Sequence, residues 1–216
     1  FVLTCAVRRL RGHLTAHNSM LVHVSRLIAW QHHIKDIVES VFDFYRRGIE
    51  MNVPSIIEEF RIAFEEDNDA YKSYRTTSAQ ILNNRLAGID PHIQVHTWGE
   101  VLPLLNDAAS RIIVREINGG SGDVLNYYDH PNGLSVIAIG GDKLSRGLTL
   151  EGLSVSYYLR ASRMYDTLMQ MGRWFGYRPG YVDLCRLFIS RELNEWFCHI
   201  TLASQQLRED FDYMAD

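Results

Sequence analysis

The segment LSVIAIGGDKLSRGLTLEGLSVSYYLR, residues 134–160, holds two apolar runs on either side of a glycine-rich stretch. The first run, residues 134–141, is continuous and ends in paired glycines, and the second covers residues 153–160. Short continuous apolar runs are typical of strands that are buried on both faces. We therefore predict strands at 134–141 and 153–160, and a parallel sheet around them.

The rest of the chain alternates in the same way between apolar runs and segments with helical spacing. The further strands that we predict lie at 18–26, 93–98, 111–118 and 181–190. The predicted helices cover 27–47, 54–71, 77–87, 163–173 and 191–213. This alternation predicts an α/β fold with a mostly parallel sheet and helices on both faces.

The domain organisation follows from the same reading. Residues 1–17 are expected to be a connector or the end of a helix, and residues 18–216 a single domain. Between residues 50 and 69 there are seven acidic residues and one arginine. We therefore expect an acidic helical insertion at about 50–90.

Composition excludes several classes of protein. The net charge of −4 argues against a general nucleic-acid coat protein, although residues 140–191 carry eight basic and four acidic residues. The three cysteines have no CxxC spacing, which argues against a disulfide framework or a zinc site. No apolar run is long enough to span a membrane, and we expect no signal peptide. We expect a cytoplasmic protein, and a fragment of a longer one because the chain starts at Phe1.

The glycine-rich stretch after residue 139 is the first candidate site. In parallel sheets, ligands bind at the carboxyl ends of strands. Gly140, Gly141 and Gly147 would allow the backbone to approach a ligand closely, and Ser145 and Arg146 could contact phosphate. The alternative is a plain glycine-rich turn between two strands.

The second candidate site is LMQMGRWFGYRPGY, residues 168–181. Arg173 lies near the end of a predicted helix, where an arginine can reach a neighbouring domain and stabilise charge in phosphoryl transfer. The alternative is that Arg173 pairs with Asp166 or Asp183 while the surrounding aromatic rings pack in a core.

The order of these two segments resembles a known pattern. SRGLTLEG (145–152) followed by QMGRWFGYR (170–178) resembles motifs V and VI in the second RecA-like domain of superfamily-2 helicases. MLVHVSR (20–26) resembles the motif IV strand. The sequence of residues 134–190 resembles the Z-one domain still more closely, a family labelled as an endonuclease. This family occurs beside helicase cores in bacterial proteins linked to restriction and DNA methylation.

The resemblance implies roles for particular residues. It implies that Arg173 and Arg178 are catalytic, although Arg178 is displaced by two positions from the usual second arginine of motif VI. Similarly, Thr149 stands where many helicases have aspartate. The residues that the resemblance places at the nucleotide are Gly147, Glu151 and Gln170. Those that it places on nucleic acid are Ser25, Arg26, Ser145 and Arg146.

The cofactors and partners follow from what the sequence lacks. It has no Gly-Lys-Ser/Thr step and no apolar strand that ends in Asp-Glu, so it holds neither a phosphate-cradling loop nor the usual magnesium carboxylates. We expect ATP and Mg²⁺ to be bound mainly by a missing N-terminal RecA-like domain of the same protein. The other expected partners are DNA rather than RNA, and a DNA methyltransferase or a separate ATPase.

The predicted function is therefore the C-terminal half of a nucleic-acid-dependent, helicase-like ATPase in a restriction or defence system. One alternative is a metal-dependent endonuclease. The Asp/Glu-x-Lys motif of restriction-type nucleases is absent, but metal sites at His13 and His17, at Cys198 and His199, or around Glu116, Asp123 and Asp129 stay open. Another alternative is a protein-interaction module that uses acidic helices at 54–87.

Overall fold

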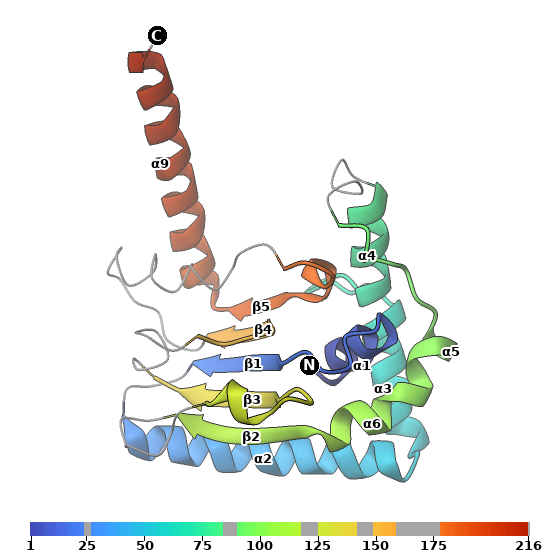
Figure 1. Ribbon diagram of the computed structural model, residues 1–216. Coiled ribbons are helices and arrows are strands. Elements are labelled where there is room, and N and C mark those ends of the chain that lie inside the picture. The colour runs from blue at the N-terminus through green and yellow to red at the C-terminus, as the bar shows by residue number, and fades with distance from the viewer. Residues whose placement is uncertain (24–26, 84–89, 118–124, 142–148, 159–177, 216) are drawn as a thin grey trace.

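The computed structural model describes residues 1–23, 27–83, 90–117, 125–141, 149–158 and 178–215. Its centre is a five-stranded sheet (Figure 1) with the order β2-β3-β1-β4-β5. The strands are β1 (Asn18–His23), β2 (Ile112–Ile117), β3 (Ser135–Gly140), β4 (Leu153–Tyr158) and β5 (Arg186–Ile189). All four neighbouring pairs are parallel, which confirms the predicted α/β class with a parallel sheet.

The described helices surround this sheet unevenly. They are α1 (Val2–Leu10), α2 (Ile28–Glu50), α3 (Pro54–Glu65), α4 (Tyr74–Asn83), α5 (Trp98–Val101), α6 (Leu105–Ser110) and α9 (Arg191–Ala215). Figure 1 shows α2 running along the sheet, and α1, α3, α4, α5 and α6 gathered near the amino ends of the strands. Helix α9 projects away from the body, beginning beside the carboxyl end of β5.

The apolar runs form these strands because both faces of the sheet are covered. Every residue of β3 is buried, and its side chains alternate between two clusters, with Ile137 and Ile139 in one and Ala138 in the other. On the second face, Leu193 of α9 is buried in the cluster, and Phe197 and Ile200 pack against it. A strand covered on both sides has no reason to alternate apolar and polar residues.

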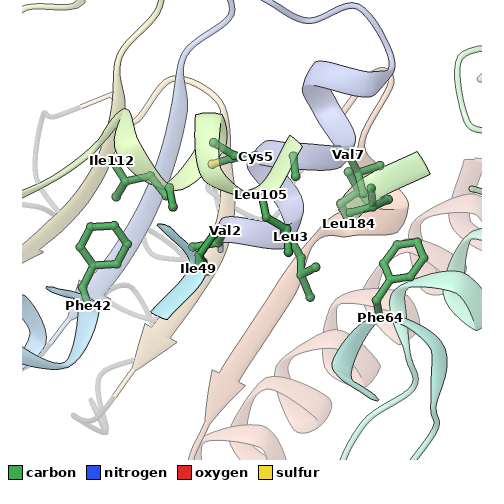
Figure 2. Close-up of a cluster of buried hydrophobic side chains, with 14 of the residues drawn as sticks. Val2, Leu3, Cys5, Val7, Phe42, Ile49, Phe64, Leu105, Ile112 and Leu184 are labelled. Atoms are coloured by element: carbon green, nitrogen blue, oxygen red, sulfur yellow. The ribbon is translucent and has the colours of Figure 1, made fainter. Parts of the chain in front are cut away.

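Residues 1–10 belong to the core. Seven of the nine residues of α1 are buried, and Val2, Leu3, Cys5 and Val7 point into the cluster in Figure 2. The acidic helical segment shares this core, because α3 and α4 bury Ile56, Phe64 and Tyr74 in the same cluster. The segment is thus packed into the fold through its apolar side chains, while its acidic residues stay mostly on the outside.

The prediction of a strand at 93–98 is wrong. Residues 93–97 have no regular structure, and helix α5 begins at Trp98. Thr97 and Glu100 form a capping box, in which the Glu100 carboxylate accepts a hydrogen bond of 2.7 Å from the Thr97 N–H. Such reciprocal capping fixes a helix start and overrides the alternating pattern of Ile93, Val95 and Thr97.

Two other predicted elements are shorter in the structure. The strand predicted at 181–190 begins only at Arg186, because Val182–Leu184 form a 3₁₀ turn. The helix predicted at 54–71 ends at Glu65. After it, the Asn68 side chain accepts hydrogen bonds from the backbone N–H groups of Ala70 and Tyr71, which closes a turn in place of further helix.

Candidate functional site

Three strands end side by side at the carboxyl edge of the sheet, which we define by His23 of β1, Gly140 of β3 and Tyr158 of β4. His23 pairs in register with Gly140 on one side and with Tyr158 on the other. The segments that follow these strands in sequence are 24–26, 141–148 and 159–177. These segments contain most of the site residues that the sequence predicts. Because the three strands end side by side, all three segments begin at one edge of the sheet.

An aromatic pair occupies the middle of the carboxyl edge. The imidazole of His23 stacks on the phenol ring of Tyr158, with 5.1 Å between ring centroids and 27° between ring planes. Both residues are buried, and burial raises the pKa of Tyr158 well above its usual range. Neither residue was predicted from the sequence as a site residue, although a histidine at the end of an apolar strand is a visible signal.

Next to this edge, β2 pairs with β3 and also contacts helix α2. Glu116, the penultimate residue of β2, lies 3.3 Å from the imidazole of His32 near the start of α2. Within the carboxylate cluster that we considered, Asp123 lies outside the described residues. Asp129 accepts a hydrogen bond of 2.7 Å from the Asn126 side chain.

The opposite edge of the sheet is held by a buried ion pair. The Arg11 guanidinium donates two hydrogen bonds to the Asp183 carboxylate, at 2.7 and 2.6 Å, and both side chains are almost wholly inaccessible to solvent. Arg11 also donates to the backbone carbonyls of Gln94 and Gly180, and the Ser78 hydroxyl donates to Asp183. This arrangement ties together four segments that are distant in sequence.

Arg8 completes what we call the amino-edge hub, namely Arg8, Arg11, Ser78 and Asp183. Its guanidinium donates to the side chain of Asn18 at 2.6 Å and to the carbonyl of His17 at 2.8 Å, where β1 begins. It also lies 4.0 Å from the centre of the Tyr181 ring. The hub therefore joins α1 to the starts of β1 and β5 and is a structural element.

Two of the predicted site residues lie on this amino side of the sheet. Glu151 precedes β4, is exposed, and has its carboxylate 3.7 Å from the imidazole of His17. Arg178 is half-buried close to Tyr181 and Cys185: burial raises the pKa of Cys185 to about 11, and the nearby charge of Arg178 opposes that rise. The structure therefore brings neither residue to the carboxyl edge.

The remaining predicted residues lie outside the described part of the chain. They are Ser25, Arg26, Ser145, Arg146, Gly147, Gln170 and Arg173. The proposed partner Asp166 of Arg173 also lies outside it. The other proposed partner, Asp183, is already engaged by Arg11.

His13 and His17, considered as a pair of metal ligands, contact different partners. Helix α1 ends at Leu10, so His13 and His17 do not share a helical face. His13 lies edge-on to Tyr181, whereas the Nδ1 atom of His17 accepts a hydrogen bond from the Leu134 N–H. Among the residues that the structure describes, no three His, Cys, Asp or Glu side chains lie close enough to hold a metal ion.

Within the described ranges no helix is long and apolar enough to cross a membrane.

Comparisons with known proteins give one positive result. No curated protein and no solved structure matches the chain. The family model of the Z1 (Z-one) domain matches residues 1–216. The match covers the whole chain, and so the chain belongs to the Z1 domain family.

Proposed function

We propose that this chain is the C-terminal, RecA-like half of a nucleic-acid-dependent ATPase that serves a DNA restriction or defence system. Its part would be to contact nucleic-acid phosphates and to supply an arginine to a nucleotide held by an N-terminal domain. A DNA methyltransferase or a separate ATPase would be a partner of the whole protein.

The observation that carries this proposal is the register at the carboxyl edge. His23 pairs in register with both Gly140 and Tyr158, so the three segments that follow these residues leave the sheet from neighbouring strands. Strands in a sheet lie about 5 Å apart. The basic residues Arg26, Arg146 and Arg173 follow these three strands in sequence, and the second and third segments also contain Lys143, Arg160 and Arg163. Ligands of parallel α/β sheets bind where the strand order reverses, and here that point is the centre of this edge.

Arg173 is the residue to which we assign the catalytic role. A guanidinium that reaches the transferred phosphoryl group neutralises charge that develops in the transition state. Its planar fork also fixes the geometry of two phosphate oxygens, which an ammonium cannot do. Arg178, close to Tyr181 beside the amino-edge hub, would serve the fold more than the reaction.

The nucleotide and its metal would rest mainly on the other domain. The described residues hold no carboxylate cluster for Mg²⁺, and the sequence has no phosphate-cradling loop. ATP bound there supplies the phosphoryl group. The residues of this chain would orient that group, shield it from water and stabilise its charge.

Steady-state ATP turnover of the full-length protein tests the assignment. Arg173→Ala should lower turnover about a thousandfold or more and leave nucleotide affinity largely intact, because an arginine in this role stabilises the transition state and not the bound nucleotide. Arg173→Lys should restore little. A folded Arg173→Ala protein with near-normal turnover would refute the catalytic role.

Arg178→Ala is the matched control within the same segment. Because Arg178 lies beside the hub, its loss should lower the melting temperature without a selective loss of turnover. A selective loss of turnover in a fully stable Arg178→Ala protein would instead make Arg178 the displaced second arginine of the site.

A further inference from the structure

An apolar groove lies between helices α2 and α3 and one face of the sheet, and we call it the α2–α3 groove. Its volume is about 710 Å³. Val41 of α2 and Phe60 of α3 line its helical side. Ile137 of β3 and Phe188 of β5 line the side that the sheet supplies. Concave surfaces of this size with a mainly apolar lining are the usual places where a partner binds.

The groove is open because α2 covers only part of this face of the sheet. The helix packs against β2 and β3, along the β2 side of the sheet in Figure 1. Tyr157 of β4 pairs in register with both Val22 and Phe188, so the three side chains share one face. Val22 is buried, whereas Tyr157 and Phe188 are 40 % and 41 % exposed, with 6.2 Å between their ring centroids. The β5 side of this face therefore presents two adjacent aromatic rings to solvent.

The exposed apolar surface extends from the groove along α2. Ile37 and Val41 line the groove, and Phe44 continues the same stripe at helical spacing. All three side chains are exposed. The other side of α2 is in the core, where Phe42 and Ile49 are buried. A helix that is apolar on two sides is expected to be covered on both.

The helices that wall the groove also carry the negative charge of the molecule. Residues 36–69 include ten acidic and three basic residues, a net charge of −7, whereas the whole chain carries −4. Glu59 lines the groove itself, and its carboxylate accepts a hydrogen bond of 2.8 Å from the Tyr45 hydroxyl. Arg61, the single basic residue of α3, is shared among three glutamates. A partner with positive charge is therefore complementary to these walls.

One basic residue, Arg186, belongs to the groove lining. Its guanidinium donates to the Thr77 hydroxyl at 3.2 Å and to the carbonyls of Asp183 and Cys185. It also lies 4.1 Å from the centre of the Tyr74 ring. These contacts fix Arg186 against the body of the protein, and the charge of the walls stays strongly negative.

We propose that the α2–α3 groove docks a basic amphipathic helix of a protein partner. The apolar face of such a helix would cover the exposed rings and the α2 stripe, and its basic face would lie near the acidic walls. A helix satisfies its own backbone hydrogen bonds, whereas an extended segment would leave its N–H and C=O groups without partners in an apolar groove between helices. The inference does not rest on the proposed ATPase role.

The charge of the walls disfavours other occupants. Nucleic acid and anionic lipid are both negatively charged and would be repelled. A second copy of the chain could offer the exposed end of α9, with Leu207 and Phe211. However, residues 208–210 between them include two acidic residues and one basic residue. A second copy would therefore bring further negative charge to the groove.

The experiment measures the affinity of the full-length protein for a fluorescently labelled synthetic peptide of leucine and lysine, with leucine at helical spacing. The peptide should bind, and its affinity should fall as salt rises. Val41→Asp and Phe188→Asp each place a charge in the apolar surface and should lower the affinity about tenfold or more. Glu59→Gln keeps an acceptor for the Tyr45 hydroxyl but loses one charge, so the affinity should fall by up to about fivefold.

Leu207→Asp is the matched control, because it places the same charge on exposed apolar surface of α9. Its affinity for the peptide should equal that of the wild type. A peptide with glutamate in place of lysine should not bind. Circular dichroism melting checks that each variant is folded, and if Phe188→Asp is not, Val41→Asp decides, since more than half of Val41 is exposed.

Four results would overturn the proposal. They are no binding of the lysine peptide by the wild type, equal binding of the glutamate peptide, an equal loss of affinity in Leu207→Asp, and a dimer in sedimentation equilibrium that Phe188→Asp abolishes. The last result would assign the groove to a second copy of the chain.

Discussion

Asp183 is the residue on which the amino edge of the sheet depends most. Its carboxylate is inaccessible to solvent and accepts hydrogen bonds from Arg11 and Ser78. Removing one partner of a buried ion pair leaves the other charge without compensation, at a cost of about 3–5 kcal/mol. We therefore expect Asp183→Ala to lower the free energy of unfolding by about that amount, as measured by urea denaturation.

An exposed ion pair gives the matched comparison. Asp107 lies on α6, is partly exposed, and pairs with Arg111 at 3.0 Å and with Arg9. Exposed pairs contribute about 0–1 kcal/mol, so Asp107→Ala should change the free energy of unfolding little. Equal losses for the two aspartate variants would show that the Arg11–Asp183 pair does not hold the edge as described.

Helix α9 divides into two halves with different surroundings. Leu193 is fully buried, and Phe197 and Ile200 pack beside it, whereas Leu202, Leu207 and Phe211 are more than half exposed. Truncation after Ile200 should therefore leave the melting temperature of the chain almost unchanged. Leu193→Ala should lower the free energy of unfolding by about 2–5 kcal/mol, as for other buried leucines. A truncation as damaging as Leu193→Ala would contradict this division.

The sequence predicted the types of most elements because their signals are local. The apolar runs of β3 and β4 and the helical spacing of α2 and α9 depend on neighbours within one element. The failure at 93–98 was also local. An alternating pattern and a capping box, Thr97-Trp98-Gly99-Glu100, compete in the same few residues, and the reciprocal hydrogen bonds of the box prevail.

The site could be predicted only as separate segments. Arg11 and Asp183 are 172 positions apart, and no local sequence pattern predicts their pairing. The stack of His23 on Tyr158 likewise depends on β1 and β4 becoming neighbours, which is a property of the strand order. For the same reason, sequence spacing alone could not show that Glu151 and Arg178 lie on the amino side of the sheet.

The molecule as a whole separates stability from the proposed function. The amino edge carries the buried ion pair, the hub and the cluster of short helices (Figure 1), whereas the carboxyl edge starts the segments with Arg26, Arg146 and Arg173. The net charge of −4 disfavours binding to nucleic acid, so binding would have to come from a few local phosphate contacts. We propose that these contacts are made at the carboxyl edge.

The salt dependence of DNA binding tests this claim most directly. The affinity of the chain for a single-stranded DNA oligonucleotide should be weak and should fall steeply with salt, because each phosphate contact releases a counterion. Arg146→Ala should reduce the magnitude of the slope of log affinity against log salt by about 1, which corresponds to one lost phosphate contact. Arg111→Ala, which removes an exposed arginine just before β2 at the amino edge, should leave the slope unchanged. Affinity that is insensitive to salt, or an equal loss of slope in both variants, would contradict a phosphate grip at the carboxyl edge.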